Sequence, residues 1–201
     1  MIHETAVIGP NVILEDGVHI GPFCMVQGKT RIGAGTRLEG HCSIGAPAEH
    51  HDFFETEGEL EIGHDCIIRE FVTINAGTTG KTHVGDRVVF LKGSHVGHDA
   101  IVSSDSTISC GVLIGGHSHI MRGANLGLGA ILHQYTIIGA YAMLGMGTVV
   151  TKRNLIKPGF IYKGNPARFL RDNRLGLQRF QVNEFELSAA QSEFELLVYG
   201  S

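Results

Sequence analysis

Residues 6–47 consist of seven blocks of six residues: AVIGPN, VILEDG, VHIGPF, CMVQGK, TRIGAG, TRLEGH and CSIGAP. The third residue of every block is Ile, Leu or Val, and the first residue is usually small or β-branched. The same phase resumes at residues 60–77, and a second run of hexads then continues without a break from Val84 to Val150. A half-buried strand has a period of two and a helix has a period near 3.6, so neither explains a period of six.

A six-residue unit suits one short strand and one tight turn, and three such units close a triangular coil. The third side chain of each unit then points into the coil, and the first points inward near a corner, where a small group fits. Glycine follows the third position in many blocks, and we expect it to permit the turn. Stacked coils hydrogen-bond to one another at a spacing of about 4.8 Å and so satisfy the backbone. The sequence therefore predicts an all-β fold, a parallel β-helix of hexapeptide repeats over residues 1–153.

Two interruptions break the period, at residues 46–59 and at residues 78–81. We interpret the first as a protruding loop or a degenerate coil, because His50 and Thr56 stand where aliphatic residues belong, and the second as a smaller bulge. Interruptions of such a regular stack are places where function is often found.

The hexads stop after residue 153. Residues 154–201 are predicted to form a cap strand or loop over the open end of the coil, followed by short helices. The helices are expected over residues 168–182 and 188–199, and Ser188 is the expected N-cap of the second one.

Composition narrows the function classes. The chain has 201 residues, of which 43% are hydrophobic and 18% charged, and its net charge of −4 gives no electrostatic basis for binding nucleic acid. The first residues lack the basic-then-apolar order of a signal peptide, and no apolar run approaches ~18 residues, so we expect a cytoplasmic protein without membrane insertion. None of the four cysteines forms a CxxC pair, and Cys24 and Cys42, one coil apart, are expected to be neighbours in the interior.

The chain has 12 histidines, and the coil period brings four of them together. Residues 98, 116 and 134 differ by one coil of 18 residues each, so His98, Gly116 and Gln134 occupy equivalent places on successive coils. His117 and His133 adjoin the second and third of these places, and His95 lies on the rung of His98. The cluster predicted near one corner comprises His95, His98, His117 and His133.

Several longer segments resemble one known family. They are IREFVTINAGT (68–78), SHVGHD (94–99), GGH (115–117), NLGLGAILHQYTIIGAYAMLGM (125–146) and GNPA (164–167). In these segments, which span nearly all of the predicted β-helix, the chain is similar to the UDP-N-acetylglucosamine O-acyltransferases of lipid A biosynthesis. It is shorter than that family by tens of residues, mostly in the C-terminal helical region, and so resembles a shortened paralogue. The resemblance implies a left-handed β-helix and a homotrimer.

The resemblance also implies an activity, which is the transfer of a medium-chain 3-hydroxyacyl group from acyl carrier protein to a UDP-sugar. The acceptor atom would be the 3-hydroxyl, or 3-amine, of a UDP-N-acetylglucosamine-type nucleotide sugar. Because a sugar hydroxyl is a poor nucleophile, a base must remove its proton as it attacks the thioester carbon. No metal and no cofactor beyond the carrier-protein thioester is implied.

By the same resemblance, His98 in its HxxHD arrangement is the general base. Asp99 would hold the imidazole in the right tautomer, and Gly116 would be the backbone donor to the oxyanion. Met146 falls at the position that acts as a ruler for the acyl chain, where a bulky residue shortens the chain. The substrate-binding positions implied by the resemblance are His95, His117, His133, Gln134, Asn173 and Arg179.

Three other functions are compatible with a hexapeptide β-helix. An acetyl-CoA-dependent sugar acetyltransferase shares the fold and a histidine base, but it uses acetyl-CoA in place of acyl carrier protein. A γ-class carbonic anhydrase also shares the fold and holds zinc with three histidines between subunits, which a histidine cluster could imitate. A non-catalytic scaffold is the third, and it leaves the HxxHD and GGH segments unexplained.

Overall fold

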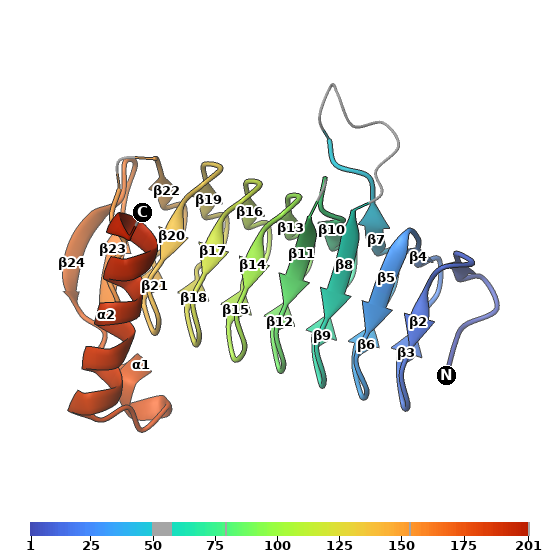
Figure 1. Ribbon diagram of the computed structural model, residues 1–201, viewed down its shortest axis with the longest axis horizontal. Coiled ribbons are helices and arrows are strands. Elements are labelled where there is room, and N and C mark those ends of the chain that lie inside the picture. The colour runs from blue at the N-terminus through green and yellow to red at the C-terminus, as the bar shows by residue number, and fades with distance from the viewer. Residues whose placement is uncertain (50–57, 79, 153, 201) are drawn as a thin grey trace.

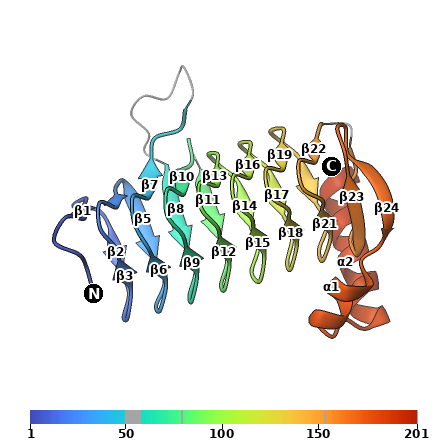
Figure 2. The same cartoon turned by 180° about the vertical axis from the view of Figure 1, so that it is seen from behind.

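A computed structural model describes residues 1–49, 58–78, 80–152 and 154–200 of the chain. The coils stack into one elongated body, with the N-terminus at one end and both helices at the other (Figures 1 and 2). Each coil contributes one strand to each of three sheets, and successive coils pair in parallel. The predicted left-handed parallel β-helix of hexapeptide repeats is confirmed.

The three sheets are referred to below as face 1, face 2 and face 3. Among the described residues, the strands of face 1 are β1 (Val7–Ile8), β4 (Met25–Val26), β7 (Ser43–Ala46), β10 (Thr73–Asn75), β13 (His95–Val96), β16 (Leu113–Ile114), β19 (Ile131–Leu132) and β22 (Val149–Val150). Those of face 2 are β2 (Ile13–Leu14), β5 (Lys29–Ile32), β8 (Glu59–Ile62), β11 (Lys81–Val84), β14 (Ile101–Val102), β17 (His119–Ile120) and β20 (Ile137–Ile138). Those of face 3 are β3 (His19–Ile20), β6 (Arg37–Leu38), β9 (Ile67–Ile68), β12 (Val89–Phe90), β15 (Thr107–Ile108), β18 (Asn125–Leu126), β21 (Met143–Leu144), β23 (Phe160–Lys163) and β24 (Arg168–Asp172).

Side chains at the third position of the hexads fill the interior, as predicted. The register of the parallel pairs places equal positions above one another, so Phe90 lies between Ile68 and Ile108, and all three are fully buried. First-position residues are buried as well, including Cys24 and Cys42, which are free thiols. Because side chains alternate along a strand, the second position points outward and decides the chemistry of each face.

The corners use glycine differently from our expectation. The left-handed φ falls at the sixth position of the hexad, where Asp99 (56°), His117 (56°) and Tyr135 (61°) stand without being glycine. Most glycines after the third position have an ordinary φ, so the expectation that they serve the turn is wrong. They are needed for close approach between coils instead, since a Cβ on Gly97 would lie 2.7 Å from the amide nitrogen of Gly116.

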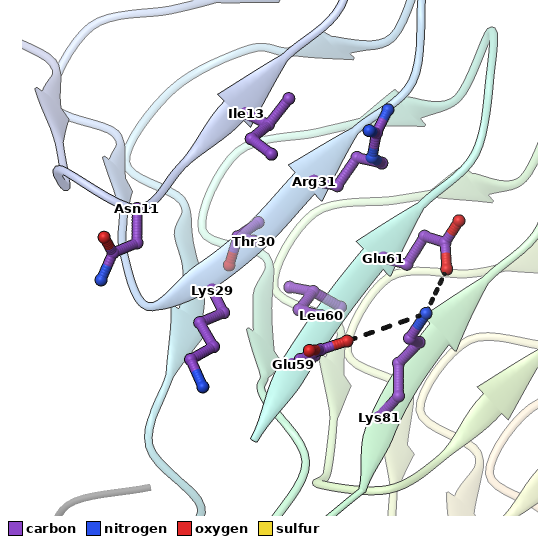
Figure 3. A pocket seen from close by; sticks show the side chains of 9 residues that line it. All are labelled: Asn11, Ile13, Lys29, Thr30, Arg31, Glu59, Leu60, Glu61 and Lys81. Atoms are coloured by element: carbon purple, nitrogen blue, oxygen red, sulfur yellow. Dashed lines mark hydrogen bonds and ion pairs between the residues drawn. The ribbon is translucent and has the colours of Figure 1, made fainter. Parts of the chain in front are cut away.

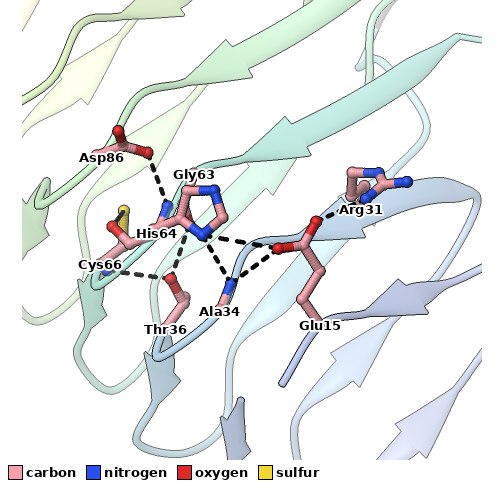
Figure 4. A network of polar contacts seen from close by, with 8 residues as sticks. All are labelled: Glu15, Arg31, Ala34, Thr36, Gly63, His64, Cys66 and Asp86. Atoms are coloured by element: carbon pink, nitrogen blue, oxygen red, sulfur yellow. Dashed lines mark hydrogen bonds and ion pairs between the residues drawn. The ribbon is translucent and has the colours of Figure 1, made fainter. Parts of the chain in front are cut away.

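The coils on either side of the first interruption stack directly on each other. Strand β5 pairs in register with β8, which places Arg31 beside Glu61. Figure 4 shows polar contacts that join these coils at the corner between faces 2 and 3. There the Thr36 hydroxyl donates a hydrogen bond to the carbonyl oxygen of Gly63 (2.8 Å). The coils before and after the first interruption are therefore in direct contact, and the interior is continuous between them.

The bounds of both interruptions differ from the prediction. Strand β7 extends to Ala46 and β8 begins at Glu59, so the described residues between them are 47–49 and 58. His50 and Thr56, on which our interpretation of this loop depended, lie outside the described residues. In the second interruption, Lys81 already belongs to β11.

The C-terminal part departs further from the prediction. Strand β23 continues face 3 beside β21, so the stack of strands extends beyond residue 153. Residues 168–172 were expected to be helical, but they form β24, which pairs antiparallel with the exposed edge of β23. The backbone groups of that edge are satisfied by a returning strand more directly than by a helix, which bonds only to itself.

Two helices follow β24, α1 (Arg174–Arg179) and α2 (Glu184–Tyr199). Helix α2 begins after Asn183 rather than at Ser188, because the Asn183 side chain accepts from the Glu186 amide (2.9 Å) and the Glu186 carboxylate accepts from the Asn183 amide (3.0 Å). This reciprocal pair is a capping box, which satisfies two backbone donors that the helix leaves open. In the described part of the chain, no helix has both the length and the apolar character needed to cross a membrane.

Candidate active site

The corner between faces 1 and 2 collects most of the residues that the sequence singled out. Strands β13, β16 and β19 pair in parallel and in register, so the corners that follow them lie above one another. On these three coils the fifth position holds His98, Gly116 and Gln134, and the sixth holds Asp99, His117 and Tyr135.

His98 and Asp99 form a hydrogen-bonded pair. Nδ1 of His98 lies 2.8 Å from Oδ2 of Asp99, and their side chains are only 15% and 10% exposed. A carboxylate can only accept, so Nδ1 carries the proton and Nε2 is the basic nitrogen of the neutral ring. The pair therefore presents an imidazole in one tautomer and one orientation.

The carboxylate of Asp99 is held from a second side by the residue Thr78. The Thr78 amide donates to both carboxylate oxygens (3.1 Å each), and its hydroxyl donates to Oδ2 (2.9 Å). Burial acts to raise the pKa of Asp99, but the bonds from His98 and Thr78 and the nearby His117 outweigh it, so the pKa lies below its usual value. Asp99 is therefore ionised at neutral pH.

His117 is the second histidine of the corner. Its Nε2 lies 3.7 Å from Oδ2 of Asp99, and its ring meets that of His98 edge to face, with the centroids 5.0 Å apart. The other side of the His117 ring stacks on Tyr135 at 4.5 Å, and Nζ of Lys152 lies 5.3 Å from the centroid of the Tyr135 ring. Our sequence reasoning missed Tyr135, although its spacing of 18 residues from His117 was available as a signal.

Gly116 lies directly against the imidazole of His98. A Cβ at this position would be 2.9 Å from Nε2 and 3.0 Å from Cε1 of His98. Within the described part of the chain, the Gly116 amide donates no hydrogen bond to another protein group, while its carbonyl oxygen accepts from the Tyr135 amide (3.0 Å). Gly116 thus adjoins the basic nitrogen, and its amide has no acceptor among the described residues.

His95 and His133 lie near the same corner, but each forms its hydrogen bond with a residue other than His98, Asp99 or His117. Nδ1 of His95 lies 2.8 Å from the hydroxyl of Thr73 on β10, and burial lowers the pKa of His95 and favours the neutral ring. Nδ1 of His133 donates to the carbonyl oxygen of Gln134 (2.9 Å). The compact cluster is therefore His98, Asp99 and His117, and the other two histidines flank it.

These three clustered residues also satisfy the spacing of a metal site. One ligand atom from each lies within 4.8 Å of the others. The set holds two histidines and a carboxylate whose oxygen already accepts from His98 and Thr78, whereas the carbonic anhydrase alternative requires three histidines. The hydrogen bonds observed here are those of an acid–base pair.

Asn173 and Arg179 lie near the other end of the molecule, beside face 3. The Asn173 side chain is 6% exposed, donates to the carbonyl oxygen of Tyr141 (2.8 Å) and accepts from the Gly176 amide as the cap of α1. The Arg179 guanidinium lies 5.6 Å from the ring centroid of Phe180. Both residues border a groove of about 180 Å³ on face 3.

Met146 follows β21 and precedes β22, so it stands at the corner between faces 3 and 1. Its exposed fraction is 75%. His98 stands at the opposite edge of face 1, so the two residues do not share a corner of one chain.

A separate groove of about 350 Å³ lies on face 2 toward the N-terminal end (Figure 3). Both of its carboxylates lie near one cation, since Lys81 is bonded to Glu61 (2.7 Å) and lies 3.9 Å from Glu59. It contains no histidine or cysteine among its lining residues. We therefore assign no catalytic role to this groove.

Comparison with known proteins finds several close relatives. The chain is 36% identical over 197 residues to the acyl-[acyl-carrier-protein]–UDP-N-acetylglucosamine O-acyltransferase of Agrobacterium fabrum, which covers 96% of this chain and 71% of that protein. It is 38% identical over 196 residues to the protein of the same name from Sinorhizobium fredii, covering 89% and 71%. No family model matches the chain.

Solved structures agree with these relatives. The UDP-N-acetylglucosamine O-acyltransferase of Moraxella catarrhalis superposes with a TM-score of 0.79 at 28% identity, covering 100% of this chain and 85% of that one. A UDP-N-acetylglucosamine acyltransferase of Bacteroides fragilis gives 0.81 at 27% identity, covering 100% and 86%. The likeness therefore covers 89–96% of this chain in sequence and all of it in structure.

Proposed function

The chain belongs to the family of acyl-[acyl-carrier-protein]–UDP-N-acetylglucosamine O-acyltransferases and is an acyltransferase, and from this premise we propose that it transfers a medium-chain 3-hydroxyacyl group from acyl carrier protein to the 3-hydroxyl of a UDP-N-acetylglucosamine-type sugar. The observation that carries the proposal is the hydrogen bond of 2.8 Å between Nδ1 of His98 and Asp99, with Gly116, whose amide has no acceptor among the described residues, next to the His98 ring. An amine at the same position of the sugar would react in the same way.

In the proposed mechanism His98 is the general base. Its Nε2 takes the proton of the sugar hydroxyl as the oxygen attacks the thioester carbon. Asp99 stabilises the imidazolium that forms, and the Gly116 amide donates to the oxyanion of the tetrahedral intermediate. Collapse of the intermediate breaks the carbon–sulfur bond, and the imidazolium returns its proton to the leaving thiolate. The steps balance without a metal or a redox partner.

The acceptor sugar is proposed to bind along the corner of His98. His117 adjoins the base, and His133 and Gln134 continue the same corner by one more coil. His95 lies on the rung of His98, facing outward from face 1. For the nucleotide, Arg179 offers a charged group, whereas the buried Asn173 amide is engaged within the protein and serves to shape the groove.

Face 1 supports the proposal of a homotrimer. Its outward positions hold no charged side chain: Val7, Met25, Ser43, Thr73, His95, Leu113, Ile131 and Val149. Four of them, Val7, Met25, Leu113 and Ile131, are exposed apolar residues. Packing face 1 of each copy around a threefold axis buries this surface and brings the His98 corner of one copy to the Met146 corner of the next. The acyl chain would then pass between two copies.

Acyl transfer from 3-hydroxydecanoyl acyl carrier protein to a panel of UDP-sugars tests the proposed function. We expect UDP-N-acetylglucosamine, or its 3-amino analogue, to accept the chain, because the base and the oxyanion donor lie side by side. Product can be measured by mass spectrometry. Turnover with acetyl-CoA but with no acyl carrier protein substrate would contradict the proposal and assign the chain to sugar acetyltransfer.

Replacement of Met146 by glycine is expected to change which chain lengths react. Removing a 75% exposed side chain from the proposed end of the acyl path makes room for longer chains. The rate ratio of 3-hydroxytetradecanoyl to 3-hydroxydecanoyl donors should rise by roughly tenfold or more, the scale of discrimination by a few methylenes. The matched variant Met146→Leu keeps the bulk and should keep the parent ratio. An unchanged ratio in Met146→Gly would remove the ruler role.

A further inference from the structure

The bulge between β10 and β11 closes over the carboxylate of Asp99. Regular hexads would carry the chain from face 1 to face 2 in one tight corner, but here the phase is offset by the residues that follow Asn75. The described residues of this segment include Gly77, Thr78 and Gly80. Of these three residues only Thr78 has a side chain, and its amide and hydroxyl donate hydrogen bonds to Asp99.

The bonds from Thr78 complete the coordination of the carboxylate. Its amide donates to both oxygens at 3.1 Å, and its hydroxyl donates at 2.9 Å to Oδ2, the oxygen that accepts from Nδ1 of His98 at 2.8 Å. The backbone amide of Asp99 itself donates to the hydroxyl of Thr82 on β11 (2.8 Å). The bulge therefore holds the carboxylate of Asp99, and the strand that follows the bulge holds its backbone amide.

Asp105 provides a contrast at the equivalent corner position of the following hexad. Its carboxylate is bonded to two guanidinium groups, those of Arg87 (2.7 Å) and Arg122 (3.0 Å). A cation in the same place would neutralise Asp99 and weaken its attraction for an imidazolium at His98. Thr78 supplies neutral donors instead. They orient the carboxylate without cancelling its negative charge, which remains available to attract a protonated His98 or His117.

The glycines of the bulge permit this close approach. A Cβ on Gly77 would lie 2.8 Å from Oδ1 of Asp99, and a Cβ on Gly80 would lie 3.2 Å from the same atom. A side chain at Gly77 would also collide with the Gly80 backbone, whose carbonyl oxygen would lie 2.5 Å from the Cβ, whereas one at Gly80 would displace the carboxylate by a few tenths of an ångström. The two glycines therefore leave room for the Asp99 carboxylate beside Thr78.

We propose that Thr78 is a positioning residue for acyl transfer: it fixes the Asp99 carboxylate where it accepts the hydrogen bond from Nδ1–H of His98, which keeps Nε2 as the base. The proposal rests on the proposed function of His98, which Thr78 reaches through its hydrogen bonds to Asp99. It acts through Asp99, so its effect belongs to the rate of the chemical step and to the tautomer of the imidazole.

The test compares Thr78→Val, which removes the hydroxyl and keeps the amide, with Thr78→Ser, which keeps both donors. In Thr78→Val we expect kcat to fall by roughly 10- to 100-fold, the range for one hydrogen bond to a charged group. KM should remain close to that of the parent, and Thr78→Ser should restore most of kcat. Thr5→Val is the control, because it removes a threonine hydroxyl that bonds to the Phe23 amide (2.9 Å) at the N-terminal end.

The pH profile separates positioning from a general structural role. Losing a donor makes the Asp99 carboxylate more basic, and raises its pKa. Because His98 and Asp99 share a hydrogen bond and titrate as a pair, the acid limb of kcat/KM should move to higher pH in Thr78→Val and stay in place in Thr78→Ser and Thr5→Val. The titratable groups that face this carboxylate are His98, from the same corner, and His117, from the next coil. Equal kcat and an unmoved acid limb in Thr78→Val would overturn the proposal.

A measurement without substrate distinguishes this proposal from the proposed function. The ¹⁵N shifts of labelled histidine, assigned by comparison with His98→Gln, report the fraction of the His98 ring protonated at Nδ1. We expect that fraction to fall in Thr78→Val and to be retained in Thr78→Ser. A parent enzyme with no acyl transfer but with this tautomer change would refute the function alone. An active parent whose tautomer is the same in Thr78→Val would refute the role of Thr78 alone.

Discussion

Replacement of His98 by glutamine lowers kcat for acyl transfer by about 10²- to 10⁴-fold, the contribution of a positioned general base. Glutamine fills a similar volume and retains polar atoms, but it cannot take a proton from the sugar hydroxyl. The side chain is 15% exposed and hydrogen-bonded to Asp99, so the substitution should leave the stack of coils intact. The measurement is single-turnover transfer from 3-hydroxyacyl carrier protein at saturating UDP-sugar.

His83→Gln is the matched control for this prediction. His83 lies on β11 of face 2, where its Nδ1 is 3.8 Å from the Glu61 carboxylate, and it takes no part in the His98 corner. Its variant should transfer acyl groups at the parent rate. If His98→Gln retained more than about a tenth of the parent kcat, a base other than His98 would have to be sought, because general-base catalysis contributes more than that.

Phe90→Ala should reduce the free energy of unfolding by about 3–5 kcal/mol, the usual cost of truncating a buried phenylalanine. Phe90 is 0% exposed and is the largest of the fully buried side chains. It stacks between Ile68 and Ile108, which belong to the neighbouring coils of face 3 and contact it from both sides. The cavity would therefore be enclosed by strands that pair with one another and cannot collapse easily.

Urea unfolding at one fixed protomer concentration measures this effect, since association alters apparent stability. Val89→Ala is the control, because Val89 is the outward neighbour on the same strand and is only half-buried. It should cost far less. A loss below about 1 kcal/mol in Phe90→Ala would mean that the coil interior is loosely packed at this rung, contrary to the usual cost of such a truncation.

Much of the fold could be predicted because each hexad forms one strand and one turn, and three consecutive hexads form one coil, so the pattern of burial repeats along the sequence. The phase of Ile20 predicts the burial of Ile44 in the first run, and the phase of Val84 predicts that of Ile114 in the second, and the structure agrees at both. In the first coil, Ile8 and Leu14 are only partly buried. The same rule placed His98 and Gly116 on adjacent coils. Where the period ended, prediction failed: residues 168–172 look helical in isolation, but the open edge of β23 recruits them as a strand.

The sequence by itself determined the stack, its inward columns and the line of corners that carries His98, Gly116 and Gln134, because parallel pairing in register passes one coil's alignment to the next. Only the tertiary structure decided the hydrogen bonds from Thr78 to Asp99 and the stacking of Tyr135 on His117. These contacts depend on the path of an insertion outside the period and on side-chain directions at the corners. A repeat specifies which positions are adjacent, whereas the orientation of each group arises from the contacts it makes in the folded chain.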